Sequence, residues 1–373
     1  MKRIICTVTN DLNYDQRMIR ICTSLAKAGF KVRLLGRYRR DSQPLIHRPF
    51  EQQRLHCWFS KGKLFYLEFN VRLFFYLLFV KFDLICAVDL DTILPGLLVS
   101  KIRRKPCMYD AHEYFTETPE VVRRPMIKRI WETLARFAIP RVTAAYTVGE
   151  GLAAIFEERY GKTFGVVRNV PFQQNEIAQP DRTKPAIVLY QGALNEGRGL
   201  EAAIQAMQFV EAAELWLAGQ GDCSDALRQM TNKLNLQHKV KFLGYLRPEA
   251  LRQLTLQATI GLNLLENKGL SYYYSLANKA FDYIQAGLPS IHMRFPEYEK
   301  INNQYHTFLL IDQSDAHTIA QAIQQLLQDA TLYQQLRAHC LQSRHLFTWE
   351  KEEERLLAIY DVFIKIENKK AET

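Results

Sequence analysis

The chain has 373 residues, of which 48% are hydrophobic and 24% are charged, and it carries a formal net charge of +10. This length favours two domains, each able to bury a full sheet, and the composition excludes a disordered or low-complexity protein. The seven cysteines are scattered and odd in number, without a Cys-x-x-Cys pair, which favours reduced thiols over disulfides or a zinc motif.

The positive charge is concentrated in the first half of the chain. Residues 1–170 hold 29 Lys+Arg against 16 Asp+Glu, whereas residues 171–373 hold 20 against 23. A field of this sign attracts acidic lipid headgroups, phosphorylated acceptors or nucleic acid, and composition does not choose among them. The apolar run that follows the first charged residues is too short for the core of a secretion signal, so we expect a cytoplasmic protein.

Apolar runs typical of strands alternate with helix-like segments through the first half, which predicts a parallel βαβ series. The predicted strands cover residues 4–8, 32–36, 83–88, 107–111, 144–148 and 164–170. We assign residues 1–172 to a first Rossmann-like domain. The polar stretch 173–185, QQNEIAQPDRTKP, contains two prolines and no apolar period, and it is predicted to be the interdomain linker.

The strand pattern then restarts and predicts a second doubly wound domain over residues 186–349. Its predicted strands cover residues 186–192, 214–221, 240–246, 260–265, 288–293 and 307–312. The chain is predicted to be helical from about Ala316 to Ile366. We expect the last helix, about 350–368, to pack back on the first domain.

Residues 64–82 are apolar enough to raise the question of a membrane span. Glu68, Asn70 and Arg72 would each cost a few kcal/mol in hydrocarbon, about the penalty for a charged or polar residue inside a bilayer. A span is therefore not expected. A buried helix leading into the next strand is the first interpretation, and a helix lying on a membrane surface is the alternative.

The segment LYQGALNEGRGLEAAI (189–204) reads as a strand that ends at Gly192 and a helix that opens after Gly199. Backbone N–H groups at such a helix start, with the Arg198 guanidinium, favour a diphosphate. The spacing matches neither the dinucleotide glycine pattern nor a Walker loop, so an ordinary strand-to-helix turn remains the alternative.

A second loop-to-helix entry lies in GLSYYYSLANKAFDYIQAGLPSI (269–291), where a helix is expected to start near Asn278. Asp282 then falls one turn into the helix, where its carboxylate can accept from both hydroxyls of a ribose, and Lys279 supplies a cation for phosphate. The alternatives are a solvated helix residue for Asp282 and a surface charge for Lys279.

Taken together, several segments in order resemble the GT-B-fold glycosyltransferases of the large retaining family four, over nearly the whole chain. The matching segments are TNDLNYDQRMIRICTSLAKAGFKV, AVDLDTILPG, YDAHEYFTETPEV, YTVGEGLAAIFEERYG, YQGALNEGRGLEAAI, LAGQGD, FLGYL and SLANKAFDYIQAGLP. The resemblance implies two Rossmann-like domains facing a cleft. It places the nucleotide-sugar donor in the second half and the acceptor in the basic first half.

Carried onto this chain, the resemblance implies donor contacts from two loops and from the glycine turns after the neighbouring strands. The implied donor-binding residues are Gly192, Arg198, Gly199, Gly219, Gly221, Gly244, Tyr245, Ser275, Asn278, Lys279 and Asp282. Two departures concern the donor: Ala193 stands where many members carry an arginine, and Tyr274 stands where many carry an acid. Sugar recognition therefore does not carry over.

The resemblance also places His112, in YDAHEYF, at the sugar-transfer centre. The predicted catalytic residues are His112, Arg198 and Lys279: the histidine orients the donor sugar, and fixed N–H dipoles with the cations neutralise the leaving diphosphate. A strand-end histidine bonded to Asp110 or Glu113 is the alternative. We expect no metal and no cofactor, and we favour acceptor contact or helix capping over metal binding for Asp89 and Asp91.

The acceptor side of the site is expected at strand and loop ends of the first half. The predicted acceptor-binding residues are Asp11, Asp15, Arg17, Asp91, His112 and Glu113. Helix capping is the alternative for Asp15. The loop from Asn10 to Arg17 replaces the family's usual glycine-rich loop, which puts phosphate and acceptor contacts there in doubt.

The sequence thus predicts a metal-independent, retaining transfer of a sugar from a UDP- or GDP-sugar to a glycan or lipid-linked acceptor. The setting expected from the resemblance is cell-envelope polysaccharide or lipopolysaccharide synthesis. Basic residues of the first half are candidates for holding the enzyme on the inner face of an anionic membrane. A nucleotide-sugar epimerase and a non-catalytic nucleic-acid-binding protein are the rival interpretations, although no specific nucleic acid is expected because a basic stripe interleaved with aromatics is absent.

Overall fold

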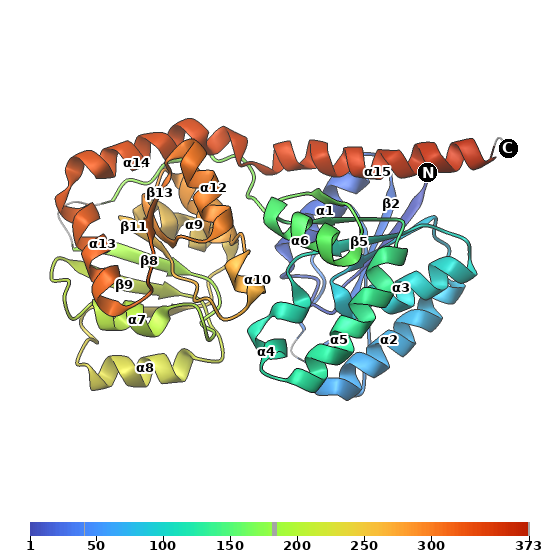
Figure 1. The fold of residues 1–373 in the computed structure, drawn as a ribbon, viewed down its shortest axis with the longest axis horizontal. Coiled ribbons are helices and arrows are strands. Elements are labelled where there is room, and N and C mark those ends of the chain that lie inside the picture. The colour runs from blue at the N-terminus through green and yellow to red at the C-terminus, as the bar shows by residue number, and fades with distance from the viewer. Residues whose placement is uncertain (41, 181–184, 372–373) are drawn as a thin grey trace. The chain divides into compact units, whose positions relative to one another are not determined.

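The computed structural model describes the backbone of residues 1–40, 42–180 and 185–371, and side chains as far as residue 361. The described residues form two compact units, one of Met1–Arg168 with the C-terminal residues from Glu352 onward, the other of Asn169–Lys351. Each unit is a parallel sheet with helices on both faces (Figure 1). The predicted pair of doubly wound domains is therefore confirmed.

The first unit contains a seven-stranded sheet in the order β3-β2-β1-β4-β5-β6-β7. Its strands are β1 Arg3–Thr7, β2 Lys31–Arg37, β3 Glu51–Leu55, β4 Leu84–Val88, β5 Cys107–Ala111, β6 Ala144–Thr147 and β7 Phe164–Val166. Every strand predicted for this half is present, and β3 is an addition. Its sequence, EQQRL, has no apolar alternation because β3 is a half-exposed edge strand, where polar side chains discourage further pairing.

The two faces of this sheet bury different partners. Ile5 and Ile85 point to the face covered by α2 (Gly62–Phe79) and α3 (Leu90–Ile102). Cys86 points to the opposite face, where its sulfur lies 3.7 Å from the Tyr146 hydroxyl. That hydroxyl lies 3.4 Å from the hydroxyl of Tyr360 on α15 (Trp349–Ala371). The last helix therefore packs in the first unit, as predicted.

Four more helices complete the first unit. They are α1 Gln16–Lys27, α4 Pro119–Val122, α5 Pro125–Ala138 and α6 Glu150–Tyr160. Helix α5 packs against α3, so that α2, α3 and α5 lie side by side in Figure 1. Strand order reverses between β1 and β4, and the loops that follow these two strands meet at this switch point.

The second unit contains a six-stranded sheet in the order β10-β9-β8-β11-β12-β13, with its switch point between β8 and β11. Its strands are β8 Ala186–Gln191, β9 Ala213–Ala218, β10 Val240–Gly244, β11 Ile260–Asn263, β12 Ser290–Met293 and β13 Phe308–Ile311. Its helices are α7 Leu200–Ala206, α8 Ser224–Lys233, α9 Pro248–Gln257, α10 Leu270–Tyr273, α11 Asn278–Ala286, α12 Pro296–Tyr305, α13 Ala316–Gln328 and α14 Ala330–Ser343.

The stretch predicted as a linker, 173–185, is hydrogen-bonded to the second unit over much of its described part. The Ala178 amide donates to the Ala286 carbonyl at 2.7 Å, and the Gln179 amide donates to the Leu256 carbonyl at 2.8 Å. Residues 181–184 of this stretch lie outside the described residues. The chain returns to the first unit within α15, between Lys351 and Glu352.

The apolar segment 64–82 forms most of helix α2. Phe65, Phe69, Leu73 and Leu77 recur every four residues and are buried against the sheet, which matches the first interpretation of this segment. The opposite side of the helix is exposed, with Phe79 80% accessible. No helix in the described part of the chain is both long and apolar enough to cross a membrane.

Candidate functional site

The predicted donor residues of the second unit gather at the carboxyl edge of its sheet. Gly192 follows β8, Gly219 follows β9, and Gly244 ends β10, which are three neighbouring strands. The loop that follows β11 reaches the same place, because the Glu266 amide donates to the Gly197 carbonyl at 2.9 Å. In open parallel sheets, ligands bind at such an edge beside the switch point.

Two of these glycines are required by close backbone contact. Gly219 has a φ of +154°, and a Cβ there would lie 1.8 Å from the Gly192 carbonyl oxygen. A Cβ at Gly221 would lie 2.5 Å from the Leu194 carbonyl oxygen. Only glycine lets the β8 and β9 loops approach this closely. The LAGQGD pattern thus has a packing role here whether or not a ligand is present.

Arg198 lies in the loop between β8 and α7. Its guanidinium carbon is 4.7 Å from the ring centroid of Tyr272, on α10. Its Nε is buried and has no hydrogen-bond partner among the described residues. Gly199 follows Arg198 and is the N-cap residue of α7. Its φ is +69°, and a Cβ there would lie 2.2 Å from the Leu264 carbonyl oxygen, so the position requires glycine.

Lys279 lies in the first turn of α11 and its side chain is buried. Its ammonium is 4.0 Å from the ring centroid of Tyr190, and a Cβ at Gly192 would lie 3.4 Å from it. Burial first, and then the positive charge of Arg198, hold the pKa of Lys279 well below its usual value, while Asp282 opposes the shift. No hydrogen bond or ion pair to Lys279 is found within the described residues.

Asp282 lies one turn further along α11, as predicted. Its Oδ2 accepts from Nε2 of Gln191 at 2.8 Å, and Oε1 of Gln191 accepts from the Thr255 hydroxyl at 2.8 Å. The carboxylate is therefore held at the end of β8 by a chain of hydrogen bonds. Asn278 starts α11 and is exposed, and no side chain caps this helix start.

Two further predicted donor residues lie on either side of this edge. Tyr245 follows β10 and is 55% exposed. Ser275 precedes α11, and its amide donates to the Tyr272 carbonyl at 3.2 Å. The structure thus brings the predicted donor residues to one edge of one sheet.

In the first unit, His112 follows β5 and belongs to a buried chain of alternating charges. Its Nε2 lies 3.1 Å from Oδ2 of Asp110, whose Oδ1 accepts from the Arg17 guanidinium at 2.9 Å. Burial would raise the pKa of Asp110, but Arg17 and His112 outweigh it and hold that pKa at about 2. Burial would likewise lower the pKa of His112, but Asp110 and Asp89 raise it to about 9.

Asp89 lies on the other side of the imidazole. Its Oδ1 accepts from the His112 amide at 2.9 Å, and its Oδ2 lies 3.6 Å from His112 Nδ1, beyond hydrogen-bond distance. Its backbone has a φ of +55°, uncommon for a residue other than glycine. Burial raises the pKa of Asp89 to about 8, against the lowering effect of His112. Asp110 is thus the anion that Arg17 and His112 share, and it favours the protonated form of the imidazole.

The remaining predicted acceptor residues divide into two groups, of which the first faces the switch point. Asp91 is buried after β4, and its Oδ2 accepts from the Thr9 hydroxyl at 2.6 Å across the switch point. Burial raises the pKa of Asp91 to about 6, with the Thr9 hydrogen bond opposing the shift. Glu113 is exposed beside His112.

The second group is engaged in contacts within the unit. Arg17 is buried and donates to the Val167 carbonyl as well as to Asp110. Asp11 accepts from Arg54 at 2.8 Å and from the Asn13 amide at 3.1 Å. Asp15 caps α1 by accepting from the Met18 amide at 3.0 Å. Acceptor binding by Arg17, Asp11 and Asp15 stays a prediction that these contacts do not support.

Sequence reasoning missed several partners of the predicted residues. Tyr190 and Tyr272 supply the aromatic faces beneath Lys279 and Arg198, and Gln191 holds Asp282. Tyr190 and Gln191 directly precede Gly192, where a strand was predicted to end, so their position at the ligand-binding edge could be inferred from the sequence. For Tyr272, the run of tyrosines in GLSYYYS gave no indication of which ring would face the arginine.

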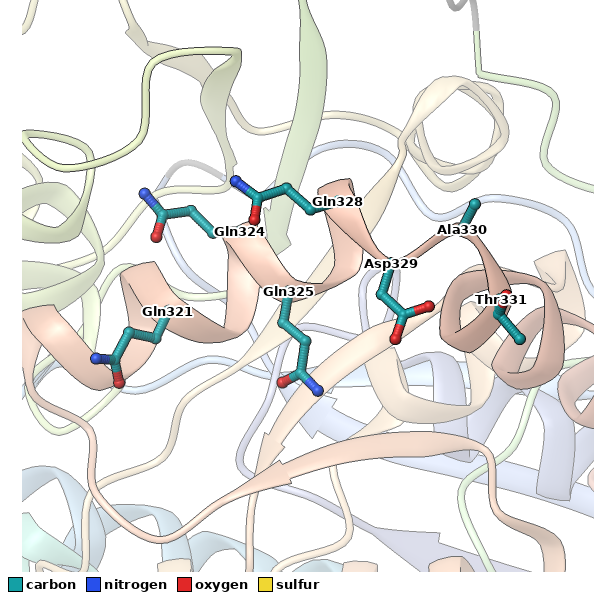
Figure 2. Close-up of a pocket in the computed structure, with 7 residues that line it drawn as sticks. All are labelled: Gln321, Gln324, Gln325, Gln328, Asp329, Ala330 and Thr331. Atoms are coloured by element: carbon teal, nitrogen blue, oxygen red, sulfur yellow. The ribbon is translucent and has the colours of Figure 1, made fainter.

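A separate hollow of about 660 Å³ lies at the turn between α13 and α14. Figure 2 shows its lining of four glutamine side chains from α13, with Asp329, Ala330 and Thr331 at the turn. Asp329 caps α14 by accepting from the Leu332 amide at 2.9 Å. None of the predicted site residues lines this hollow, and its uncharged amides offer no chemistry that the sheet edge lacks.

Solved structures with the same architecture include proteins described as glycosyltransferases. The chain is similar to sucrose-phosphate synthase from Thermosynechococcus elongatus, with a TM-score of 0.78 and 19% identity, over 98% of this chain and 100% of that one. It is equally similar in TM-score, 0.78 at 14% identity, to Anabaena Alr3699/HepE in complex with UDP and glucose, over 97% of this chain and 100% of that one. The fold is that of a GT-B glycosyltransferase.

Family models match both halves of the chain. Residues 16–170 match Glycosyltransferase Family 4, and residues 172–342 match Glycosyl transferases group 1. The two matches together span residues 16–342, and they identify the chain as a glycosyltransferase whose second half is a glycosyl transferases group 1 domain. Among curated relatives, it is 28% identical over 165 residues to the lipopolysaccharide core biosynthesis glycosyltransferase LpsD of Rhizobium meliloti, a match that covers 43% of this chain and 46% of that relative.

Proposed function

We propose that this glycosyltransferase moves a sugar from a nucleotide-diphosphate sugar to a glycan or lipid-linked acceptor in cell-envelope polysaccharide synthesis. Arg198 and Lys279 bind the diphosphate, Asp282 binds the ribose, and the first unit receives the acceptor near His112. The transfer retains the anomeric configuration and needs no metal. The likeness to LpsD supports the lipopolysaccharide setting.

The pair of cations at the switch point of the second unit is the observation that carries this proposal. Lys279 is buried and Arg198 lowers its pKa, so the two charges repel each other in a region of low dielectric. Asp282 offsets only part of this cost, so the buried ammonium favours either loss of its proton or an anionic ligand that supplies the missing partner. A diphosphate would convert this repulsion into charge-assisted hydrogen bonds, each worth about 1.5–3 kcal/mol.

Asp282 gives the pair its specificity for a nucleotide. A free diphosphate would need only the cations, whereas a nucleotide also presents the two vicinal hydroxyls of its ribose. The Asp282 carboxylate, fixed by Gln191 at the same sheet edge, is an acceptor for such hydroxyls. The bound UDP in the HepE structure makes uridine the first nucleoside to test, with guanosine next.

His112 acts in this proposal as a fixed cation rather than as a base. Its pKa of about 9 keeps the imidazole protonated at neutral pH, and Nδ1–H remains available to a substrate because Asp89 Oδ2 lies 3.6 Å away. The imidazolium then orients the donor sugar by donating to one of its oxygens. The proton of the acceptor hydroxyl passes to the leaving diphosphate, whose charge the cations offset.

The test compares two arginines that stack similarly on aromatic rings in the second unit. Arg198 lies 4.7 Å from the Tyr272 ring, and Arg228 of α8 lies 4.5 Å from the Phe242 ring of β10. Thermal shifts are measured with UDP-, GDP-, ADP- and dTDP-sugars. We expect one donor to raise the melting temperature of the wild type and of Arg228→Gln, and Arg198→Gln to weaken that donor at least about tenfold.

Equal donor affinity in Arg198→Gln and Arg228→Gln would contradict the assigned diphosphate contact. Failure of all four donors to stabilise the wild type would remove the proposed substrate class. Product analysis with the donor alone then separates transfer from epimerisation, since an epimerase converts the donor without an acceptor.

A further inference from the structure

Three neighbouring helices of the first unit expose large apolar side chains to solvent. On α2 these are Leu64, Leu67, Val71, Phe75 and Phe79; on α3, Leu98 and Ile102; on α5, Met126, Ile130 and Phe137. The exposures reach 64% for Leu67, 80% for Phe79, 81% for Met126 and 61% for Ile130. We call this set the α2–α3–α5 face.

The three helices form one continuous layer, so their exposed side chains belong to one surface. Helix α3 packs against both α2 and α5. Tyr66 of α2 also meets Trp131 of α5 edge to face, with ring centroids 5.8 Å apart. Figure 1 shows the three helices side by side. Folded proteins seldom expose an apolar surface of this kind unless it meets a partner.

An aromatic residue lies at the amino end of α2, beside this face. Trp58 is 87% exposed, although its amide donates to Glu68 at 2.9 Å and the Arg72 guanidinium lies 4.8 Å from its ring centroid. The indole is thus positioned by two residues of α2 while remaining open to solvent. Tryptophan in such a position is typical of the interface between water and lipid.

The exposed charges around the α2–α3–α5 face are mainly positive. Exposed basic residues lie within or next to the three helices: Lys61, Lys63, Lys81, Lys101, Arg104, Arg124, Arg129 and Arg136. Three acids lie within the helices, and each is engaged: Glu68 with Arg72, Glu132 with Arg159, and Asp91 with Thr9 in a buried position. Of the acids next to the helices, Asp83 pairs with Lys105, and Glu120 on α4 is exposed. The surface is therefore apolar with a cationic border.

We propose that the α2–α3–α5 face docks on an anionic lipid bilayer. The aliphatic and aromatic side chains enter the boundary between headgroups and acyl chains, and the lysines and arginines contact headgroup phosphates. A second copy of the chain fits less well, because facing copies would bring the two cationic borders together. Docking rests on the proposed function in one respect only: it would bring the enzyme to a lipid-linked acceptor.

The test is flotation of the full chain with vesicles of phosphatidylcholine alone or mixed with phosphatidylglycerol, without any nucleotide sugar. We expect binding to the mixed vesicles and a loss of at least about tenfold in Phe79→Glu and in Ile130→Glu, since each puts a charge where an apolar side chain entered the bilayer. Replacing Lys61 and Lys63 by glutamine should cost about fivefold for each lysine on anionic vesicles only.

Phe209→Glu is the matched control. Phe209 is 43% exposed in the second unit, as Phe137 is on the α2–α3–α5 face, and its substitution should leave vesicle binding unchanged. Equal binding by wild type and Phe79→Glu would overturn the proposal. So would sedimentation showing that the wild type self-associates without vesicles and that Phe79→Glu separates the copies. Donor-induced thermal shifts in the same variants report independently on the proposed function.

Discussion

The candidate sites of the two units occupy the same place in a parallel sheet but handle charge in opposite ways. In the first unit, His112 lies between Asp110 and Asp89, and Asp110 also binds Arg17, so positive and negative groups alternate. In the second unit, Arg198 and Lys279 each lie over an aromatic ring, and neither has a salt bridge among the described residues, although Asp282 favours the charged form of Lys279.

This difference indicates what each site lacks before substrate arrives. In the first site each charged group already has a partner of opposite charge, so the groups are held in position. A neutral sugar or hydroxyl can therefore bind without changing their protonation. In the second site, the burial of Lys279 and its repulsion by Arg198 disfavour the charged form, and a bound anion would offset both effects. We infer that the second unit supplies binding energy for the leaving diphosphate, and that the first unit supplies orientation.

The largest expected effect comes from replacing the buried cation of the second unit. Lys279→Met keeps the length and apolar stem of the side chain but removes its charge. We expect turnover to fall by roughly 10²-fold or more, the size of effect seen when a group that stabilises transition-state charge is removed. We also expect the ligand-free protein to become more stable, because the pKa of Lys279 is depressed and its charged form is therefore penalised in the folded state.

Lower turnover together with higher stability would distinguish a cation that binds a ligand from one that serves packing alone. Turnover is measured at saturating donor and acceptor, and stability by thermal unfolding with and without donor. Lys268→Met is the control, since that lysine is exposed and paired with Glu266 at 2.9 Å and Glu196 at 3.3 Å. A destabilised Lys279→Met protein with normal turnover would mean that the cation serves packing alone.

Much of this contrast could be predicted from the sequence, because it follows from strand ends. The apolar run 186–192 with its terminal glycine fixed the position of the Arg198 loop. The one-turn spacing of Asn278 and Asp282 placed Lys279 at a helix start. Such local patterns determine which sheet edge a residue occupies. They do not determine where a long side chain points, so the position of the Lys279 ammonium over Tyr190 required the structure.

The residues that sequence reasoning placed less well have partners far along the chain. Asp11 looked free to bind an acceptor because its partner, Arg54, lies on β3, the polar edge strand that has no apolar pattern. Arg17 was predicted to contact the acceptor, whereas it pairs with Asp110, which is 93 residues away in the sequence. Neither pairing has a local signal, since both depend on which strands become neighbours in the sheet.

The next largest effect tests whether the first site acts as a fixed cation. With a pKa of about 9, His112 should lose its proton only above neutral pH, so we expect kcat to fall as the pH rises through about 9. Asp110→Asn removes the chief group that raises this pKa, and the fall should then begin at lower pH. In a His112→Ala enzyme, kcat should be lower by roughly tenfold or more, and it should not fall further as the pH rises through about 9.

The sign of the stability change follows from the same linkage. Because the folded-state pKa of His112 is raised, its stabilising contribution is complete below the unfolded value of 6.5 and is lost as the pH rises through about 9. Asp110 has a lowered pKa, so its contribution is lost as the pH falls through about 2. Asp312→Asn, at an exposed pair with Arg294, is the control. Identical pH profiles for Asp110→Asn and wild type would contradict the charge chain.

The smallest expected effect separates capping from substrate contact by comparing one helix start in each unit. Asp15 caps α1 through the Met18 amide, and Asp315 caps α13 through the His317 and Thr318 amides, each at 3.0 Å. Replacing either aspartate by alanine should cost about 1 kcal/mol and speed hydrogen exchange in the first helical turn.

Asp15 was also predicted to bind the acceptor, whereas Asp315 was not, so the KM for the acceptor distinguishes the two roles. If capping is the whole function of Asp15, both alanine variants show equal acceptor KM values and differ from wild type only in local exchange. A raised acceptor KM in Asp15→Ala alone would show that a substrate hydroxyl reaches this carboxylate. The first site would then contain a carboxylate whose partner is a substrate hydroxyl. In that respect it would resemble the second site, where a bound diphosphate is proposed to pair with the cations.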